Sequence, residues 1–252
     1  MDTTVRKRLL ERLGLRDLGS VRENLSPAQL VEESIRRGEA TLSDSGALVA
    51  MTGKRTGRSP ADRFIVENSL TRDRVDWGAI NKPFPSEDFE RILEKAAEYI
   101  KGLDEVFVVD AYAGADPRYR LNVHVVTEHA WQALFARQLF RRPSKAELDS
   151  FEPDWTVISV PGLLTDPEED ATESETFVGI DFERRVVLVC GTAYAGEIKK
   201  SIFTVLNFVL PTERGVFPMH CSANAGKRGD VALFFGLSGT ARRPYLPTPN
   251  GI

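Results

Sequence analysis

The sequence predicts a mixed α/β fold from three features. Apolar runs such as EVFVVDAYAG and WTVISV have the length and composition of buried strands. Two segments, SPAQLVEESIRRGEA and SEDFERILEKAAEYIKG, combine helical spacing of apolar residues with a serine at the start. Helices and strands follow one another without strict alternation, so the class is α/β or α+β rather than a regular series of βαβ units.

The first helix is predicted from its amino-terminal signals. Ser26 is the expected cap, Pro27 occupies the first helical position, and Gln29 completes a capping box. The segment from Ser86 repeats this design and is expected to stop at Gly102. Between the two helices, residues 54–64 are predicted to form a basic, turn-rich loop.

The remaining elements are predicted in chain order. Strands are expected at 105–114, 120–127 and 155–160, with a helix at 128–140 between the second and third of them. A hairpin is expected at 177–191, followed by an apolar helix, SIFTVLNFVLP, that ends at Pro211. Two last strands are expected in GVFPMHCSAN and DVALFF.

Composition limits the class of protein. The chain has 252 residues, of which 42% are hydrophobic, and a net charge of −4. A mildly acidic chain without a basic stripe argues against nucleic-acid binding. The sequence has no run of about eighteen apolar residues, as a membrane span requires, and no apolar secretion signal. Two cysteines make no disulfide framework. We therefore expect a soluble, cytoplasmic protein.

Two short stretches carry candidate chemistry on cationic side chains. In TGRSP, Arg58 on a tight turn suits bidentate capture of a carboxylate or phosphate, although a solvated surface arginine is the plainer interpretation. In YAGEIKK, Lys199 and Lys200 begin an apolar helix. One of them can point inward as a neutral amine, or both can be solvated.

Two further stretches concern histidine and glycine. His220, in FPMHCSAN, is either a metal ligand or a satisfied core histidine. Cys221 is interpreted as a packing residue, and His124 and His129 as structural. After DVALFF, Gly236 begins a glycine-rich turn of the kind that starts a phosphate-binding loop, a weak signal by itself.

Taken in order, these stretches resemble ATP-dependent phosphoenolpyruvate carboxykinase. The matching text is RTGRSPADRFIV, FVVDAYAGADPRYRLNVHVVTEHAWQALFARQLFRRP, GTAYAGEIKKSIFTVLNFVLP and MHCSANAGKRGDVALFFGLSGT. The likeness runs almost continuously from about residue 44 to Thr240, and the family's chain is about twice as long. Its members convert oxaloacetate and ATP to phosphoenolpyruvate, ADP and CO₂, the first committed step of gluconeogenesis, with Mn²⁺ and Mg²⁺ as cofactors.

The resemblance implies a domain plan and a set of partners. Residues 1–214 would form the amino-terminal substrate domain, 215–240 would begin the nucleotide-binding domain, and 241–252 would be an aberrant tail. The implied partners are oxaloacetate or phosphoenolpyruvate and CO₂. No nucleic acid or membrane partner is implied, and the full-length enzyme is expected to be a monomer.

The resemblance also implies roles for single residues. Arg58 and Tyr194 would contact the substrate, Lys200 would bind substrate and manganese as a neutral amine, and Lys199 would be its catalytic neighbour. His220 would be the second manganese ligand. The nucleotide would be held by the first half of a phosphate loop, formed by Gly236, Leu237, Ser238, Gly239 and Thr240.

The sequence departs from the family after Thr240. The family continues Gly-Lys-Thr-Thr-Leu-Ser, whereas this chain has ARRPYLPTPNGI. Arg242 is no simple replacement for the loop lysine, and Ala241 lacks the freedom of glycine. We hypothesise that the tail is the same gene read one base out of frame, because one inserted base can restore the family sequence. Sequencing the DNA past the codon for Gly236 tests this, and an unbroken frame as given would refute it.

The departure predicts a chain with little or no turnover. It also predicts poor solubility, because DVALFF would expose an apolar edge. A non-catalytic dicarboxylate-binding or interaction fragment is therefore the alternative function. An unrelated phosphate-loop kinase is disfavoured, because TGRSP, YAGEIKK and MHCSAN all occur in the carboxykinase order.

Overall fold

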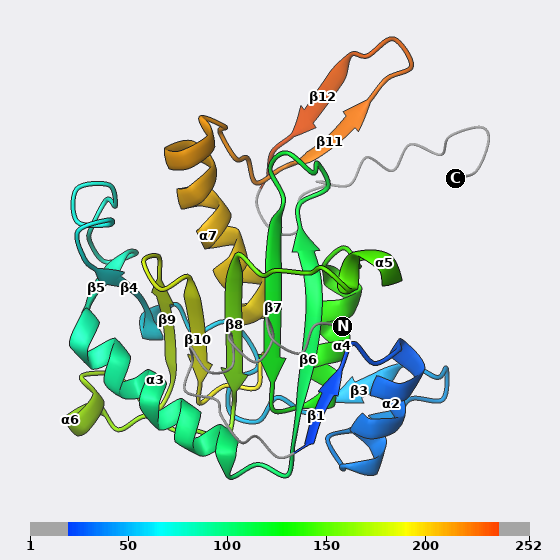
Figure 1. Cartoon of the computed structure of the whole chain (residues 1–252), viewed down its shortest axis with the longest axis vertical. Helices are drawn as coiled ribbons and strands as arrows, with labels where there is room; N and C mark the ends of the chain where they lie inside the picture. The colour runs from blue at the N-terminus through cyan, green and yellow to red at the C-terminus, as the bar shows by residue number, and fades with distance from the viewer. Residues whose placement is uncertain (1–19, 237–252) are drawn as a thin grey trace. The chain divides into compact units, whose positions relative to one another are not determined.

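The computed structural model describes residues 20–236, and its main sheet has eight strands in the order β1-β6-β7-β8-β10-β9-β4-β5 (Figure 1). The bounds are β1 Ser20–Glu23, β4 Arg63–Glu67, β5 Lys82–Pro85, β6 Glu105–Ala113, β7 Leu121–Thr127, β8 Trp155–Val160, β9 Phe177–Asp181 and β10 Val186–Cys190. The β6–β7 and β9–β10 pairs are antiparallel, and the other neighbouring pairs are parallel. The predicted mixed α/β class is confirmed.

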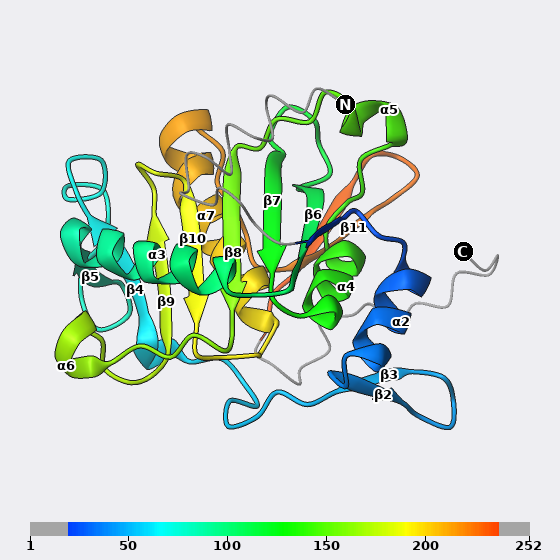
Figure 2. The same ribbon diagram turned by 60° about the horizontal axis from the view of Figure 1, so that its bottom comes forward.

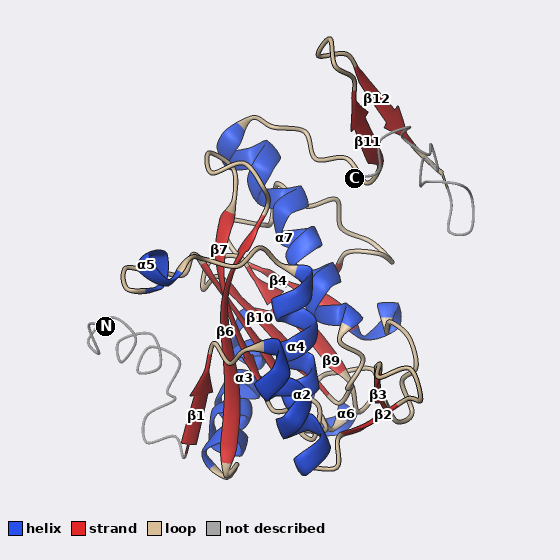
Figure 3. Cartoon of the chain, turned by 90° about the vertical axis from the view of Figure 1, so that its right-hand side faces the viewer, coloured by secondary structure: helices blue, strands red, loops and turns tan. Residues whose placement is uncertain are grey.

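Helices lie on both faces of this sheet (Figure 3). Their bounds are α2 Pro27–Arg36, α3 Ser86–Lys101, α4 Ala130–Leu139, α5 Lys145–Leu148, α6 Pro167–Asp170 and α7 Gly196–Arg214, with a 3₁₀ turn at Pro60–Asp62. Helix α3 crosses one face (Figure 2) and buries Phe89, Ile92 and Ile100 against the sheet residues Phe177 and Leu188. Helix α4 packs on β6 and β7 and also against α2. The core is therefore continuous from α3 into the sheet.

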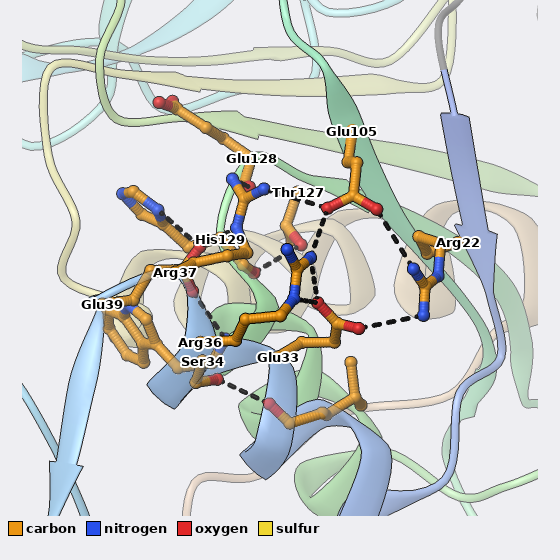
Figure 4. A network of polar contacts seen from close by, with 12 residues as sticks. Arg22, Glu33, Ser34, Arg36, Arg37, Glu39, Glu105, Thr127, Glu128 and His129 are labelled. Carbon is orange, nitrogen blue, oxygen red and sulfur yellow. Dashed lines mark hydrogen bonds and ion pairs between the residues drawn. The ribbon is translucent and has the colours of Figure 1, made fainter.

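A network of ion pairs fastens α2 to the edge of the sheet (Figure 4). Glu105 at the start of β6 accepts hydrogen bonds from Arg22, Arg36 and Arg37, and Glu33 of α2 accepts from Arg22 and Arg36. These five side chains come from β1, β6, α2 and the residue that ends α2. The network joins segments that lie far apart in the sequence.

The two predicted helix starts have different outcomes. The capping box of α2 is confirmed, since Gln29 N donates to Ser26 Oγ at 3.3 Å and Ser26 N donates to Gln29 Oε1 at 2.9 Å. In α3 the cap is Pro85, with no side-chain hydrogen bond, and Ser86 is already helical. The Ser86 hydroxyl instead accepts a hydrogen bond from Arg184. The expected stop at Gly102 is confirmed as the C-cap.

Two predicted boundaries before residue 215 are wrong. Arg63 and Phe64 belong to β4 rather than to the 54–64 loop, because FIV is an apolar run that pairs with β9 and β5. Helix α7 continues through Pro211 to Arg214. A proline this close to the end of a helix removes one hydrogen bond without preventing a last turn.

The chain divides into two units, Met1–Val205 and Leu206–Ile252, and each is described by itself. The second unit contains the end of α7 and an antiparallel hairpin of β11, Ser222–Ala225, and β12, Val231–Phe234. The DVALFF strand is thus confirmed, but the GVFPMHCSAN strand begins only at Ser222. Pro218, which has no N–H to donate, lies in the irregular segment before it. Within residues 20–236, no helix is long and apolar enough to cross a membrane.

Candidate functional site

Three loops of the first unit meet at one edge of the sheet because of how the strands run. Strand β10 ends at Cys190 beside Phe177, the first residue of its antiparallel neighbour β9. Strand β4 runs parallel to β9, so its start lies at the same edge. The loops before β4 and before β9 and the loop after β10 are therefore neighbours, and α7 begins from the last of them.

The loop before β4 carries Arg58 and is tied to the loop before β9. Lys54 Nζ lies 2.8 Å from Glu175 Oε1, and Arg55 donates to the Ser174 hydroxyl at 3.1 Å. Ser174 in turn donates to the buried carboxylate of Asp62 at 2.8 Å. These contacts hold both ends of residues 54–62, here called the Arg58 loop, while Arg58 itself is exposed.

The loop after β10 carries Tyr194 and is held from two directions. Gln132, fully buried in α4, donates to the carbonyl of Ala193 at 3.1 Å. The Thr192 hydroxyl accepts the Tyr194 N–H at 3.2 Å. A Cβ at Gly196 would lie 2.3 Å from the Tyr194 ring. The half-buried tyrosine therefore rests on the glycine that begins α7.

The first turn of α7 places an acid beside the Arg58 loop. The carboxylate of Glu197, whose residue is 1% exposed, accepts the Ser59 N–H at 2.7 Å. Burial raises the pKa of Glu197, while the Ser59 hydrogen bond and the charges of Arg63 and Arg58 oppose that shift. Burial lowers the pKa of Arg63. The negative charge of Glu197 opposes this shift, and the positive charge of Arg58 adds to it. The charges of both arginines therefore favour the ionised form of this buried carboxyl.

The predicted site residues are brought together only in part. Arg58, Tyr194, Lys199 and Lys200 all lie on the loops and helix start that meet at this edge. Lys199 is exposed, and Lys200 is half-buried with its Nζ 5.0 Å from the centre of the Phe203 ring.

The other predicted site residues belong to the second unit or lie outside the described residues. His220 and Gly236 belong to the second unit, where His220 is exposed in the irregular segment before β11. The expectation that His220 sits within a strand is therefore wrong. Leu237, Ser238, Gly239 and Thr240, with the tail at 241–252, lie outside the described residues. Among residues 20–236, no three His, Cys, Asp or Glu side chains gather as a metal site.

The residues expected to be structural have clear surroundings. His124 is buried and its Nδ1 lies 2.7 Å from Asp110 of the neighbouring strand. His129 is the N-cap of α4, and its Nδ1 lies 3.4 Å from Glu39. Cys190 is fully buried, whereas Cys221, interpreted as a packing residue, is only half-buried.

Three residues of the site were not found from the sequence. The sequence signal for Glu197 was its place next to Ile198, within a helix rich in apolar residues. Arg63 and Gln132 gave no such signal. Their places depend on which strand β4 pairs with and on which helix approaches the Tyr194 loop.

Comparisons with known proteins agree with the order of these segments. A family model described as phosphoenolpyruvate carboxykinase matches residues 19–244. The chain is 76% identical over 249 residues to phosphoenolpyruvate carboxykinase (ATP) of Rubrobacter xylanophilus, an alignment that covers 99% of this chain and 47% of the relative. It is 53% identical over 240 residues to phosphoenolpyruvate carboxykinase (ATP) 2 of Moorella thermoacetica, with coverages of 95% and 45%.

A third relative extends the same result. The chain is 53% identical over 230 residues to phosphoenolpyruvate carboxykinase (ATP) of Geobacillus kaustophilus, which covers 91% of this chain and 43% of the relative. The chain spans about half the length of the curated relatives it matches. The family model nevertheless covers all of the described residues, including the Arg58 loop and the start of α7. The chain therefore belongs to the ATP-dependent phosphoenolpyruvate carboxykinase family.

Proposed function

We propose that this chain supplies the oxaloacetate-binding part of an enzyme that converts oxaloacetate and ATP to phosphoenolpyruvate, ADP and CO₂. The observation that carries the proposal is the exposed Arg58 on a loop anchored beside the first turn of α7, which bears Lys199 and Lys200. Within residues 20–236, no carboxylate lies at ion-pair distance from Arg58. Its guanidinium is thus available for a substrate carboxylate.

The chemistry needs fixed positive charge at this place. Loss of CO₂ breaks the carbon–carbon bond and leaves its electron pair on an enolate, whose charge the ammonium group of Lys199 would stabilise. Arg58 would bind the carboxylates and set the geometry of the bond that breaks, with Tyr194 beside it. The enolate oxygen would then attack the γ-phosphorus of ATP, and ADP would leave.

We include Mn²⁺ and Mg²⁺ in the proposal on the strength of the family resemblance. Lys200 and His220 would be manganese ligands, and the cation would supply charge neutralisation for the enolate. The two residues belong to separate units, so we derive no geometry for such a site. Titration of the chain with Mn²⁺, followed by electron paramagnetic resonance, checks the assignment, and His220→Ala should weaken binding.

Binding of a stable dicarboxylate tests the substrate assignment. We expect oxalate to bind the chain in calorimetry and Arg58→Gln to raise its Kd at least about tenfold, the loss typical of a bidentate charged contact. Arg74→Gln is the matched control, because Arg74 is another exposed loop arginine of the same unit. Equal affinities in the Arg58 and Arg74 variants would overturn the proposed role of Arg58.

Turnover by this chain alone is expected to be absent. Ala241 and Arg242 stand where a phosphate loop needs glycine and lysine. Incubation with oxaloacetate, ATP, Mn²⁺ and Mg²⁺ should give no phosphoenolpyruvate above the level of a buffer blank. Oxalate binding without turnover would support the alternative, a non-catalytic dicarboxylate-binding fragment; ATP-dependent product would contradict it.

The proposal also covers the location, the oligomeric state and the partners of the full-length enzyme. We expect the full-length enzyme to be cytoplasmic and monomeric, to act in gluconeogenesis, and to bind neither nucleic acid nor membranes. Sedimentation of the full-length protein checks the oligomeric state.

A further inference from the structure

Glu197 is a buried acid that has no role in the proposed function. It lies in the first turn of α7, two and three residues before Lys199 and Lys200, and it is 1% exposed. Burying a carboxylate is costly unless charge and hydrogen bonds compensate it. Here the compensation comes from the Ser59 N–H and from Arg58 and Arg63.

The hydrogen bond to Ser59 is the link between the Arg58 loop and α7. The anchors through Lys54, Arg55 and Asp62 lead to the loop before β9, and the Ala61 carbonyl accepts a hydrogen bond from Lys82 of β5 at 2.7 Å. The Ser59 N–H lies 2.7 Å from Glu197 Oε1 and so joins residues 54–62 directly to α7. Ser59 is the immediate neighbour of Arg58, so the link acts next to the guanidinium-bearing residue.

Charge gives Glu197 a second effect on the same loop. The negative charge of Glu197 attracts both Arg58 and Arg63, and Arg63 is half-buried. Arg63 also donates a hydrogen bond to Thr204 of α7, which fixes it against the helix. Removing the negative charge would therefore displace the exposed partner, Arg58, outward.

We propose that Glu197 is a positioning residue that sets the separation between Arg58 and the lysines of α7. It does this through the hydrogen bond that its carboxylate accepts from the Ser59 N–H, while its negative charge attracts the adjacent Arg58. The inference rests on the proposed function, in which Arg58 and the lysines act on one substrate. Glu197 itself is not expected to touch that substrate.

Oxalate binding by Glu197→Gln, alone and combined with Arg58→Gln, tests the inference. Glu213→Gln is the control, because Glu213 is an exposed acid of the same helix. Glu197→Gln keeps the length and an acceptor for Ser59 but removes the charge. We expect its Kd for oxalate to rise about tenfold. In an Arg58→Gln background, the same change should add almost nothing, which a merely structural role would not produce. Two results would overturn the inference: unchanged binding by Glu197→Gln, which would show that the charge has no effect on Arg58, and tighter binding, which would show that the acid only repels the anion.

Hydrogen exchange at the Ser59 amide gives a readout that does not need a ligand. Protection of this amide should persist in Glu197→Gln and be lost in Glu197→Ala. Unchanged protection of the Ser59 amide in a folded Glu197→Ala protein would show that the hydrogen bond to Glu197 does not hold the loop, and would overturn the inference. If Glu197→Ala does not fold, the inference is judged from the Kd of Glu197→Gln for oxalate, measured with and without the Arg58→Gln change. If the unmodified chain does not bind oxalate, the proposed function fails, and Ser59 exchange alone then decides the role of Glu197.

Discussion

At the scale of single residues, Gly191 shows how close two of the site loops approach. It has a φ of 70°, and a Cβ there would lie 2.1 Å from the carbonyl oxygen of Glu175. Gly53 has a similar φ of 65°, but its Cβ would meet nothing within 4 Å. Alanine at Gly53 would therefore cost only the strain of the left-handed backbone, whereas alanine at Gly191 would add a steric clash.

We expect Gly191→Ala to be much more destabilising than Gly53→Ala. Both should lose about 1 kcal/mol from the positive φ, and Gly191→Ala should lose about 2 kcal/mol more because the clash is with backbone. Urea unfolding of both variants measures the difference in the free energy of unfolding. Similar losses would show that the Glu175 and Gly191 segments separate easily.

Glu39 gives a residue-scale prediction of pH dependence. Burial by itself would raise the pKa of Glu39, but His129 and Arg37, which lies 2.6 Å away, together lower it below its ordinary value of 4.5. A carboxyl with a lowered folded pKa adds stability above the unfolded pKa and loses that stability as the pH falls through the folded value.

We therefore expect Glu39→Gln to destabilise the protein most above about pH 4.5. The difference in unfolding free energy between the variant and the unmodified chain should shrink as the pH falls further. Chemical denaturation over a pH series measures it. Glu32→Gln, a change to an exposed acid of α2, should show no such trend. A constant difference for Glu39→Gln would contradict the role of its ionised form.

At the scale of elements, two capping boxes of the same chemistry begin helices that differ in length and in burial. Ser26 caps α2, which has ten residues and buries Leu30. Ser144 caps α5, which has four residues and buries none. We expect Ser26→Ala to lower the free energy of unfolding by about 1 kcal/mol and Ser144→Ala to have a much smaller effect, because little depends on α5. Thermal and urea unfolding test this, and equal losses would contradict it.

At the scale of the whole molecule, the apolar surface of the second unit predicts self-association. Val231 and Phe235 are 62% and 64% exposed on and next to β12, and Leu233 between them is exposed as well. Grouped apolar side chains on a strand invite contacts between molecules, whereas a single exposed one does not. This agrees with the low solubility expected from the sequence.

The double variant Val231→Thr, Phe235→Ser should reduce concentration-dependent association in sedimentation and light scattering. Ile80→Thr is the control, because Ile80 is 85% exposed but lies in a loop of the first unit. Its variant should associate as the unmodified chain does. An unchanged double variant would show that association arises from another surface.

Much of the local structure could be predicted from the sequence because its causes are local. The capping box of α2, the hairpin of β9 and β10 and the apolar strands follow from neighbouring residues. The prediction failed where a distant partner decided the outcome. Ser86 accepts a hydrogen bond from Arg184 instead of capping α3, and Arg63 joins β4 because it pairs with Val178 of β9.

The sequence by itself determined the family, the fold class and the segments that carry Arg58, Tyr194, Lys199 and Lys200. It did so because motif order and residue type are properties of the chain alone. Only the tertiary structure decided that the arginine loop and the helix of the lysines share the buried carboxylate of Glu197. That proximity depends on the antiparallel β9–β10 pair and the parallel β4–β9 pair, which bring residues 138 positions apart within one hydrogen bond.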